Sequence, residues 1–518
     1  MKLKNIFVHC SSSPWGDVLI FDEWHKKRGW CFPLHTEVLT DKGWKDYHQF
    51  DLIQHKVAVY KKGIITFEYA HRIVFNEQQE TARAVSLNAD FEFSLDHSVY
   101  TSTGGKNSFK IRKWGDEIKS RKGNNVVKVA GTYQSNSDNC LYPKYIYALA
   151  AFIAADGWYY KKNGEINGIG IDTKKERKAK YIKNLLDKSK VAYTQPKKRG
   201  YYRFRICKKS VQPFINILGK FKQLSYNLLH LPLNFREFII SAYTESDGWN
   251  NTHTAKGRVK DHYSMLYSTS KQNIDVLQAL VVTSGKRATL KKTENTEPTR
   301  HPKYHLSIVD KDNVTLDLRT RSISYRCQPT WDVDLGNKLL MIRHNGMVSV
   351  THNSGVGYHY IVLNGRPYAD VVYWDFLDGQ IEPGRHLNDD PIFTADEVGA
   401  HVAGRNSDSI GICLVGRNTF TNKQLEAAKE LLKILTAHFN LTLADVLGHY
   451  EDPNTDKTCP NIPLSAFRDF LYDTISVDSL QRCIEDQRAV NYVNLEKKNE
   501  AEWYKAWWYK AWKERNDH

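Results

Sequence analysis

The charge of this chain is divided unevenly along its length. Residues 31–353 hold 52 lysines and arginines against 30 acidic residues, a net charge of +22, whereas the two outer parts together carry −6. A chain of 518 residues is also too long for one hydrophobic core, and we expect about three or four domains. A basic block of this size is typical of domains that bind polyanions, nucleic acid above all. A lysine-rich surface that is merely solvated remains the alternative.

The cysteine pattern and the hydropathy of the chain indicate the cellular compartment in which the protein folds. The eight cysteines are scattered and form no Cys-x-x-Cys pair, which favours reduced thiols over a disulfide framework. The first residues, MKLKNIFVHCSSS, are too short and too polar for a signal peptide. No apolar run approaches the roughly 20 residues that span a bilayer. We therefore expect a soluble protein of the cytoplasm with no transmembrane segment.

The outer parts of the chain have the pattern of an α/β domain cut in two. Residues 4–12 read as a short buried strand that carries His9, and residues 21–30 as a helix running into a turn. After the basic block, strands are expected at 357–365 and 409–416, and an amphipathic helix at 421–440. Thr421 is its expected N-cap, and a loop at 443–461 follows and carries His449, Lys457 and Cys459.

Three of these side chains have the chemistry of a metal site. His9, His449 and Cys459 offer two imidazoles and one thiolate, which leaves a fourth position open. That is the ligand count of a catalytic zinc ion rather than of a closed structural one. Taken alone, such residues are more often packing or surface groups.

The same pieces resemble a known family. FVHCS, WHKKRGW, VGYHYIV, AHVAGRNSDSIGICLVG, LGHYE and DKTCP are similar, in this order, to the phage-type lysozymes that are N-acetylmuramoyl-L-alanine amidases and relatives of peptidoglycan recognition proteins. The resemblance implies a mixed sheet with flanking helices and a peptidoglycan substrate. It also implies synthesis in the host cytoplasm and action on the cell wall after release, and it leaves a regulatory protein partner open.

The resemblance also implies roles for single residues. His9, His449 and Cys459 match the Zn²⁺ ligands. Tyr358 and Lys457 match a pair that assists the attacking water and stabilises the oxyanion. Two further residues fall in a segment that lines the substrate cleft: His401 and Asn406.

The ends of the basic block carry the groups needed for self-excision. Cys31 can attack the carbonyl of Trp30 to form a thioester, and Ser354 can accept the acyl group. Asn353 can then cyclise onto its own carbonyl, with His352 as proton donor. Such residues mean little singly, but here they flank the boundaries that amidase continuity sets independently. Because the insert parts Trp30 from the strand with Tyr358, we expect the precursor to be a poor amidase.

The interior of the block resembles an intein. Residues 31–44, 91–102, 330–336 and 344–353 are similar to its splicing blocks, which implies an all-β horseshoe. His97 matches the histidine that helps to break the first scissile amide, and Asp332 matches an acid that aids the same step. The family usually has threonine where this chain has Ser94, so a hydroxyl group is retained.

Two segments inside the insert end in an acid before glycine: LAAFIAADG (149–157) and ISAYTESDG (240–248). Each alone reads as a core helix with a glycine cap. As a pair they resemble the two-motif LAGLIDADG homing endonucleases, which have an α/β fold. Asp156 and Asp247 would then hold Mg²⁺ for phosphodiester cleavage of double-stranded DNA. Strand-prone basic regions after each helix, with runs at 174–180 and 197–209, would face the DNA.

These resemblances give a multidomain plan. The predicted parts are an amidase in two pieces, a splicing domain in two pieces, an endonuclease, and a Trp/Lys-rich helical tail, with boundaries at 1–30, 31–135, 136–310, 311–353, 354–475 and 476–518. The predicted function is a zinc amidase precursor, an endolysin, with a self-splicing intein. The alternative is a stable nuclease with non-catalytic peptidoglycan-recognition modules, which Cys459 disfavours because recognition-only relatives typically lack that ligand. The tail either packs on its own domain or is partly disordered, or it contacts a cell wall, a membrane surface or a protein partner.

Overall fold

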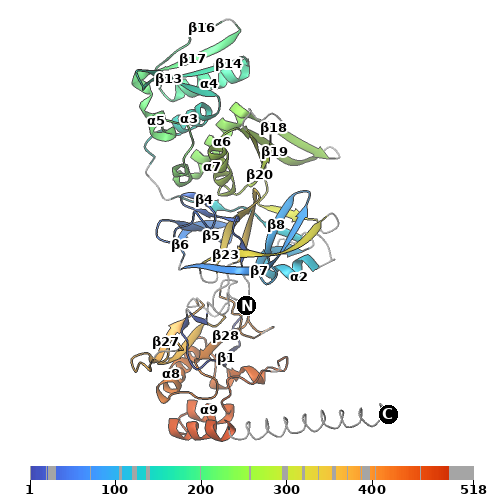
Figure 1. Cartoon of the computed structure of the whole chain (residues 1–518), viewed down its shortest axis with the longest axis vertical. Helices are drawn as coiled ribbons and strands as arrows, with labels where there is room; N and C mark the ends of the chain where they lie inside the picture. The colour runs from blue at the N-terminus through green and yellow to red at the C-terminus, as the bar shows by residue number, and fades with distance from the viewer. Residues whose placement is uncertain are drawn as a thin grey trace, which may run out of the picture. The chain divides into compact units, whose positions relative to one another are not determined.

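The chain divides into two compact units in the computed structural model (Figure 1). One unit joins residues 1–26 to 355–518, and the other comprises 27–354. The structure describes residues 2–18, 20–21, 31–70, 72–103, 108–119, 125–135, 140–198, 200–255, 258–294, 302–317, 321–335, 338–352, 357–369, 372–385, 387, 397–402, 404–455 and 457–488, with side chains left out at 197–198 and 251–262.

A five-stranded mixed sheet forms the centre of the first unit. Its order is β27-β26-β28-β1-β29, and β1 pairs in parallel with both β28 and β29. The N-terminal strand is therefore seated between two strands that lie more than 350 residues further along the chain. The strands predicted around His9 and in 357–365 and 409–416 are confirmed. The bounds are β1 Asn5–Cys10, β26 Tyr360–Asn364, β27 Asp378–Pro383, β28 Ser409–Leu414 and β29 Val446–Gly448.

The predicted helix after β28 is confirmed as α8 (Asn422–His438). The Thr421 hydroxyl accepts a hydrogen bond from the backbone N–H of Gln424 at 3.0 Å, so the expected N-cap is confirmed as well. The apolar side of α8 shares one core with α9 (Leu464–Leu471) and the sheet. The segment 443–461 was expected to be a loop, but it contains β29 and two 3-10 turns, η3 (Leu443–Asp445) and η4 (His449–Glu451). Three residues are too short a strand for periodicity to reveal.

Two sheets make up the β-rich part of the second unit. An eleven-stranded sheet has the main order β12-β6-β5-β3-β24-β25-β9-β11-β22, and a four-stranded sheet has the order β2-β23-β7-β8. The expectation of an all-β region needs one change, because α2 (Trp114–Lys119) lies within it and buries Trp114. The strands are β2 Phe32–Pro33, β3 Glu37–Thr40, β4 Gly43–Lys45, β5 Lys56–Lys61, β6 Ile64–Tyr69, β7 Arg72–Ser86, β8 Ala89–Ser94, β9 Ser98–Thr103, β10 Lys110–Lys113, β11 Asn125–Lys128, β12 Thr132–Tyr133, β22 Asn313–Leu316, β23 Ser322–Asp334, β24 Leu339–His344 and β25 Met347–His352.

Two helices, each followed by a sheet, form the remainder of this unit. Both acid-ended segments are helical as predicted, α3 (Lys144–Asp156) and α6 (Leu233–Asp247), and they pack against each other. The four-stranded sheet β18-β19-β21-β20 follows α6, and β13-β14-β17-β15, with β16 paired to β17, follows α3. The other bounds are β13 Gly157–Lys162, β14 Glu165–Thr173, α4 Glu176–Lys188, β15 Tyr193–Thr194, β16 Lys197–Lys198, β17 Tyr201–Cys207, η1 Lys208–Ser210, α5 Gln212–Leu218, η2 Tyr226–His230, β18 Gly248–Ala255, β19 Arg258–Ser268, α7 Lys271–Val282, β20 Arg287–Thr293 and β21 Lys303–Val309.

The basic regions after α3 and α6 were expected to be strand-prone, and this was wrong for part of each. Residues 176–188 form α4, because Ala179, Ile182 and Leu185 recur at helical spacing and are buried. Residues 271–282 form α7, whose N-cap is the hydroxyl of Ser270. The basic run at 174–180 therefore begins a helix instead of lining a sheet.

A buried arginine links the β-rich and α/β parts of the second unit. Arg343 in β24 is almost fully buried, donates to Asp275 in α7 at 2.7 Å and forms a bidentate pair with Glu37 in β3. Removal of one partner from a buried ion pair typically costs about 3–5 kcal/mol. The two parts also share one hydrophobic core, and they therefore fold against each other.

Two expectations about the chain's environment and its tail can be compared with the structure. None of the eight cysteines, all within the described ranges, forms a disulfide. Among the described residues, no helix has the length and apolarity needed to cross a membrane. The tail is helical from 477 to 488, where Leu480 and Ile484 are buried in the core of the first unit. The repeated WYKAW segment lies outside the described residues.

Candidate functional sites

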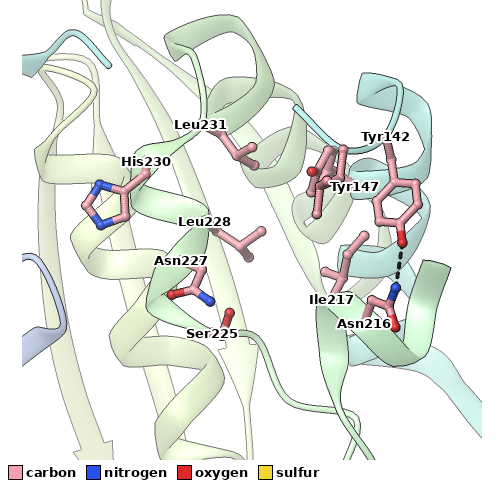
Figure 2. A pocket seen from close by; sticks show the side chains of 10 residues that line it. Tyr142, Tyr147, Asn216, Ile217, Ser225, Asn227, Leu228, His230 and Leu231 are labelled. Atoms are coloured by element: carbon pink, nitrogen blue, oxygen red, sulfur yellow. Dashed lines mark hydrogen bonds between the residues drawn. The ribbon is translucent and has the colours of Figure 1, made fainter. Parts of the chain in front are cut away.

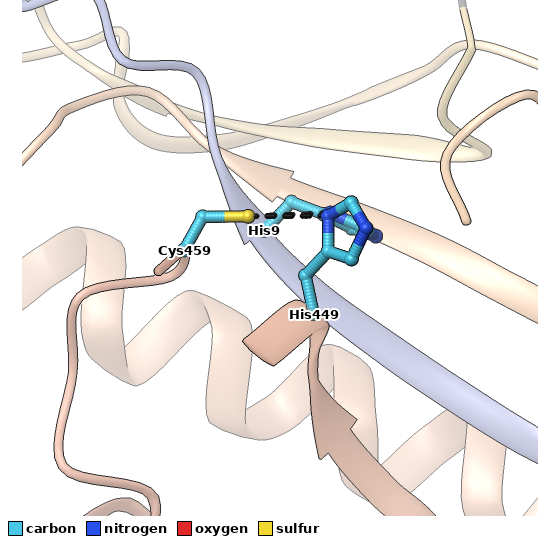
Figure 3. Close-up of side chains that lie close together, drawn as sticks. All are labelled: His9, His449 and Cys459. Carbon is cyan, nitrogen blue, oxygen red and sulfur yellow. Dashed lines mark hydrogen bonds between the residues drawn. The ribbon is translucent and has the colours of Figure 1, made fainter. Parts of the chain in front are cut away.

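The three predicted zinc ligands meet at one edge of the five-stranded sheet (Figure 3). His9 comes from β1, His449 from the turn after β29, and Cys459 from the loop beyond it. The Cys459 sulfur lies 3.3 Å from Nδ1 of His449 and 3.7 Å from Nδ1 of His9. All three ligand atoms lie within 4.8 Å of one another. This donor set, one sulfur and two imidazole nitrogens converging on a point, fits a zinc ion.

A chain of hydrogen bonds orients the His9 ring. Nε2 of His401 lies 3.3 Å from the carbonyl oxygen of Ser409, which can only accept, so this nitrogen carries the proton. Nδ1 of His401 is then the acceptor for Nε2 of His9, 3.2 Å away. His9 therefore presents the lone pair of Nδ1 toward Cys459. Burial lowers the pKa of His9 and of His401 well below the usual value, so both rings are neutral.

His401 and Asn406, which the resemblance places in a segment lining the substrate cleft, lie behind His9 and in the loop next to it. His401 is buried behind His9, and two glycines make room for its ring, since a Cβ on Gly399 or Gly411 would lie 2.5 Å from it. Asn406 accepts from the backbone N–H groups of His401 and Val402 at 2.8 Å each. Both residues thus shape the loop behind the zinc ligand. Their predicted contact with substrate stays a prediction.

Tyr358 and Lys457 lie beside the same cluster. The rings of Tyr358 and His9 have centroids 5.2 Å apart. Burial raises the pKa of Tyr358 well above its usual value, so the phenol stays a hydrogen-bond donor. Lys457 is exposed, and its charge adds to burial in lowering the pKa of His449. Tyr358 adjoins His9 in the uncut chain because β1 and β26 both flank β28. Trp30, from which the insert was expected to part the strand with Tyr358, lies outside the described residues, so that expectation stays a prediction.

The first predicted splicing residue is held at the start of the insert. Cys31 is fully buried, and its backbone N–H, the nitrogen of the first scissile bond, donates to the Ser94 hydroxyl at 3.0 Å. The Ser94 N–H donates back to the Cys31 carbonyl at 3.0 Å. Ser94, where the intein resemblance leads one to expect threonine, thus keeps a hydroxyl contact with the nitrogen of the predicted scissile bond. Trp30, Asn353 and Ser354 lie outside the described residues.

His97 directly precedes β9, and His352 is the last residue of the neighbouring strand β25. Nε2 of His97 is 2.5 Å from the hydroxyl of Thr351, which itself donates to the carbonyl of Ser98. The imidazole therefore carries its proton on Nε2. His352 is buried and pairs with Ser98 between β25 and β9.

Asp332 completes the predicted splicing set. It is buried in β23, and extension of the β2–β23 register by one residue sets it opposite Cys31. Its carboxylate accepts from the backbone N–H of Val333 at 2.7 Å.

Sequence reasoning missed a residue at the Cys31 sulfur. The side-chain amide of Asn76 in β7 donates to this sulfur at 3.1 Å. An N–H that points at the sulfur favours the thiolate, which is the nucleophilic form. Asn76 lies 45 residues beyond Cys31 on a long, partly exposed strand, and nothing in its local sequence marks it.

The two predicted acids meet at the ends of α3 and α6. Asp156 and Asp247 are within hydrogen-bonding reach, and burial together with the charge of Asp156 raises the pKa of Asp247 to about 6. Both are followed by a glycine at which a Cβ would lie 2.8 Å from neighbouring backbone. Each glycine thus allows the close backbone approach at the end of its helix, where the strand begins. The two carboxyl groups that precede these glycines lie together there.

Two lysines that the sequence could not single out lie at this pair. Nζ of Lys178 in α4 is 2.7 Å from Asp156. Lys222 donates to the carbonyl of Gly157 at 2.5 Å, burial lowers its pKa, and both acids lie close enough to act on it. A cavity of about 470 Å³ beside Asp247 is lined in part by Lys222. Lysine is too abundant in this chain for composition to distinguish these two.

The sheets after α3 and α6 carry exposed aromatic residues near basic ones. Trp158 is partly exposed and is covered by Arg205 at 5.8 Å. Arg203 in the same sheet pairs with Asp172 at 2.7 Å. The side chains of Tyr201 and Tyr202 are exposed in β17, within the predicted basic run at 197–209. A mixed aromatic and basic sheet is suited to contact with nucleic acid.

A second cavity, of about 270 Å³, lies near η2 (Figure 2). Tyr142 and Asn216 close one side through a 2.6 Å hydrogen bond. His230 on the other side lies 3.2 Å from the carbonyl of Asp41 in the β-rich part. Its lining holds neither of the predicted acids.

Comparison with known proteins gives similarities in the amidase region. A family model described as N-acetylmuramoyl-L-alanine amidase matches residues 285–462, a range that begins before Ser354. The chain is 32% identical over 117 residues to an endolysin of Klebsiella phage KP32 and 32% identical over 119 residues to an endolysin of Enterobacteria phage T3. Each match covers 21% of this chain and 61% of the relative, so the chain spans about three-fifths of their length. These similarities support a phage-type amidase.

Solved structures that are similar fall into two groups. A structure of variants of the homing endonuclease I-DmoI matches with 18% identity and a TM-score of 0.24, covering 32% of this chain and 88% of that one. The N-acetylmuramoyl-L-alanine amidase LysC from Clostridium intestinale matches with 24% identity and a TM-score of 0.17, covering 23% of this chain and 66% of that one.

Proposed function

We propose that this chain is the precursor of a zinc-dependent N-acetylmuramoyl-L-alanine amidase, interrupted by a self-splicing insert that carries a DNA endonuclease. The observation that carries the proposal is the cluster of His9, His449 and Cys459. One ligand precedes the insert and two follow it, yet their donor atoms converge. The division of the chain into residues 27–354 and an outer unit also supports an insertion.

In the amidase, some residues would bind the metal ion, and others would orient a ligand or donate hydrogen bonds to the substrate. Zn²⁺ held by His9, His449 and Cys459 would supply Lewis-acid polarisation of the scissile carbonyl and activation of water. His401 keeps His9 in the required tautomer. Tyr358, a phenol that stays protonated, and the cationic Lys457 are placed to donate to the developing oxyanion. The substrate class is peptidoglycan, cut at the amide between N-acetylmuramic acid and L-alanine.

For splicing, the contacts around Cys31 support the first step. Its sulfur attacks the carbonyl carbon of Trp30, the C–N bond breaks, and the nitrogen of Cys31 takes up a proton. Ser94 holds that nitrogen and Asn76 holds the sulfur. The acyl group then passes to the Ser354 hydroxyl, Asn353 cyclises and releases the insert, and the ester rearranges to an amide.

For the endonuclease, the meeting of Asp156 and Asp247 supports metal-dependent cleavage of double-stranded DNA. Mg²⁺ held between them would activate water and stabilise the leaving oxygen. Lys178 and Lys222 are the cations nearest to this pair.

The deciding experiment is mass spectrometry of the expressed chain. We expect a ligated product that lacks residues 31–353, together with the free insert, while Cys31→Ala with Asn353→Ala keeps the chain whole. Intact chain alone from the unmodified gene would refute splicing. It would favour the alternative of a stable nuclease with recognition modules if the chain also failed to release L-alanine peptides from peptidoglycan.

The endonuclease is tested separately. Asp156→Asn should abolish Mg²⁺-dependent nicking and leave splicing intact. Equal loss of both activities would show that the two parts of the insert do not act independently.

A further inference from the structure

A second cluster of metal-binding side chains lies in the β-rich part of the insert, away from the residues used above. It consists of His35, Glu92 and His344, whose donor atoms all lie within 4.8 Å of one another. His35 follows β2 and is exposed, whereas Glu92 in β8 and His344 at the end of β24 are buried. Amidase chemistry, splicing and DNA cleavage, as proposed above, leave this cluster unused.

The hydrogen bonds of His344 fix which of its nitrogens can bind a cation. The side-chain amide of Asn345 donates to Nε2 of His344 at 3.0 Å and also to the carboxylate of Asp90 at 3.3 Å. Nε2 is therefore an acceptor. Nδ1 lies 3.0 Å from the Thr36 hydroxyl and carries the proton. The acceptor nitrogen, Nε2, also lies 3.7 Å from the Glu92 carboxylate, so a cation bound there would replace the Asn345 amide as its partner.

The two oxygens of Glu92 have different surroundings. Oε1 accepts from the Thr81 hydroxyl at 2.8 Å and from the Gln328 amide at 2.6 Å. Oε2 faces Nε2 of His344 at 3.7 Å. Two acceptors, a carboxylate oxygen and an imidazole lone pair, therefore face each other in a buried place. The Asn345 amide satisfies the imidazole, and a cation between the two would satisfy both acceptors.

The geometry is close to that of a zinc-type site. Bonds of about 2.0–2.2 Å in a tetrahedral site set neighbouring ligand atoms about 3.4 Å apart, near the 3.7 Å that separates Glu92 from His344. The His35 ring lies beside that of His344, with centroids 4.9 Å apart and the planes tilted by 47°, and it is exposed enough to turn inward. Asp90 lies 4.0 Å from His344 but is engaged by Arg83.

We propose that His35, Glu92 and His344 bind a divalent transition-metal ion of the zinc class. Two imidazoles and a carboxylate suit Zn²⁺, Co²⁺ and Ni²⁺ better than Mg²⁺ or Ca²⁺. The ion would tie together the turn after β2, strand β8 and the tip of the β24–β25 hairpin. Because these segments come from both ends of the insert, the ion stabilises its fold. The proposal does not depend on splicing.

The test uses the full chain with Cys31→Ala and Asn353→Ala, which stays uncut whether or not the unmodified chain splices. Cys459→Ser is added to remove the thiolate ligand of the amidase cluster. After equilibration with Zn²⁺ and removal of free metal, we expect one zinc ion per chain by elemental analysis. His35→Ala should remove it, and Glu92→Gln, which can keep the Thr81 contact, should weaken binding at least about tenfold. His48→Ala, which alters another exposed histidine nearby, is the matched control.

Two further measurements separate the outcomes. Co²⁺ in this chain should give ligand-field absorption without the thiolate charge-transfer band that a Cys459-bound ion produces. Zn²⁺ should raise the thermal midpoint of the chain but not of its His35→Ala form. Zinc content that His35→Ala leaves unchanged, or a thermal midpoint that Zn²⁺ raises equally in the His35→Ala form, would overturn the proposal. A failure to splice would leave these readouts interpretable.

Discussion

The hydrogen bond between His9 and His401 leads to a quantitative prediction about zinc affinity. The imidazole of His401 accepts the N–H of a ligand that is only 1% exposed. In His401→Ala this N–H loses its acceptor, and water cannot readily replace it in a closed site. The His9 ring is also free to change tautomer, which would turn a protonated nitrogen toward Cys459. We therefore expect weaker zinc binding without a change to any ligand.

The size of the effect follows from the cost of the orphaned donor. A buried donor left without a partner costs about 1–3 kcal/mol. At about 1.4 kcal/mol per tenfold change, this corresponds to a loss of roughly 5- to 150-fold in zinc affinity. That range agrees with the 10- to 100-fold typical of residues that hold a metal ligand. His401→Gln, whose amide oxygen can accept the same N–H, should recover a large part of the loss.

The assay follows the thiolate-to-cobalt charge-transfer band, which reports on Cys459 alone and ignores the second metal cluster. Co²⁺ titrations in competition with a chelator give affinities for the Cys31→Ala, Asn353→Ala chain and for the same chain with His401→Ala. His438→Ala, an exposed histidine at the end of α8, serves as control. A folded His401→Ala chain with unchanged affinity would refute the argument from tautomer and burial, whatever its amidase activity.

The remaining predictions concern the insert. Asn76→Ala should slow the first splicing step up to about tenfold, because one hydrogen bond of about 1 kcal/mol to the attacking sulfur is lost. Thiol-induced cleavage at Trp30 measures this rate, and Asn88→Ala, which alters an exposed asparagine, should cleave normally. Equal rates for Asn76→Ala and the unmodified chain would contradict the role of Asn76. Mg²⁺-dependent nicking should fall as the pH drops through about 6, because Asp247 has a raised pKa and holds a proton below that value; a pH–rate profile flat from 5 to 7 would contradict it. Lys222→Met should reduce nicking about 100-fold, with Lys220→Met as the surface control, and an unaltered rate would exclude Lys222 from the chemistry.

Local patterns in the sequence determined much of the fold. The apolar runs at β1 and β28, the period of α8 and its Thr421 cap were readable because each is fixed by neighbours in the chain. The two Asp-Gly helix ends were also readable, since helix followed by glycine is a local signal. The basic regions after them misled, because lysine and arginine lie on the exposed faces of helices and strands alike. Burial at i, i+3 and i+4 was the sign that α4 is a helix.

Tertiary structure decided the contacts that join distant segments. His401 behind His9, Asn76 at the Cys31 sulfur, and the pair of Lys178 and Lys222 at the acids all depend on strand register and helix packing that no local pattern records. The sequence could name metal ligands of the right chemical types, but a histidine is a ligand only where folding aims a lone pair at a common point. Folding does this at His9, where a carbonyl sets the protons of two successive rings. At His344, an asparagine amide and a threonine hydroxyl from other segments likewise set which nitrogen is the acceptor.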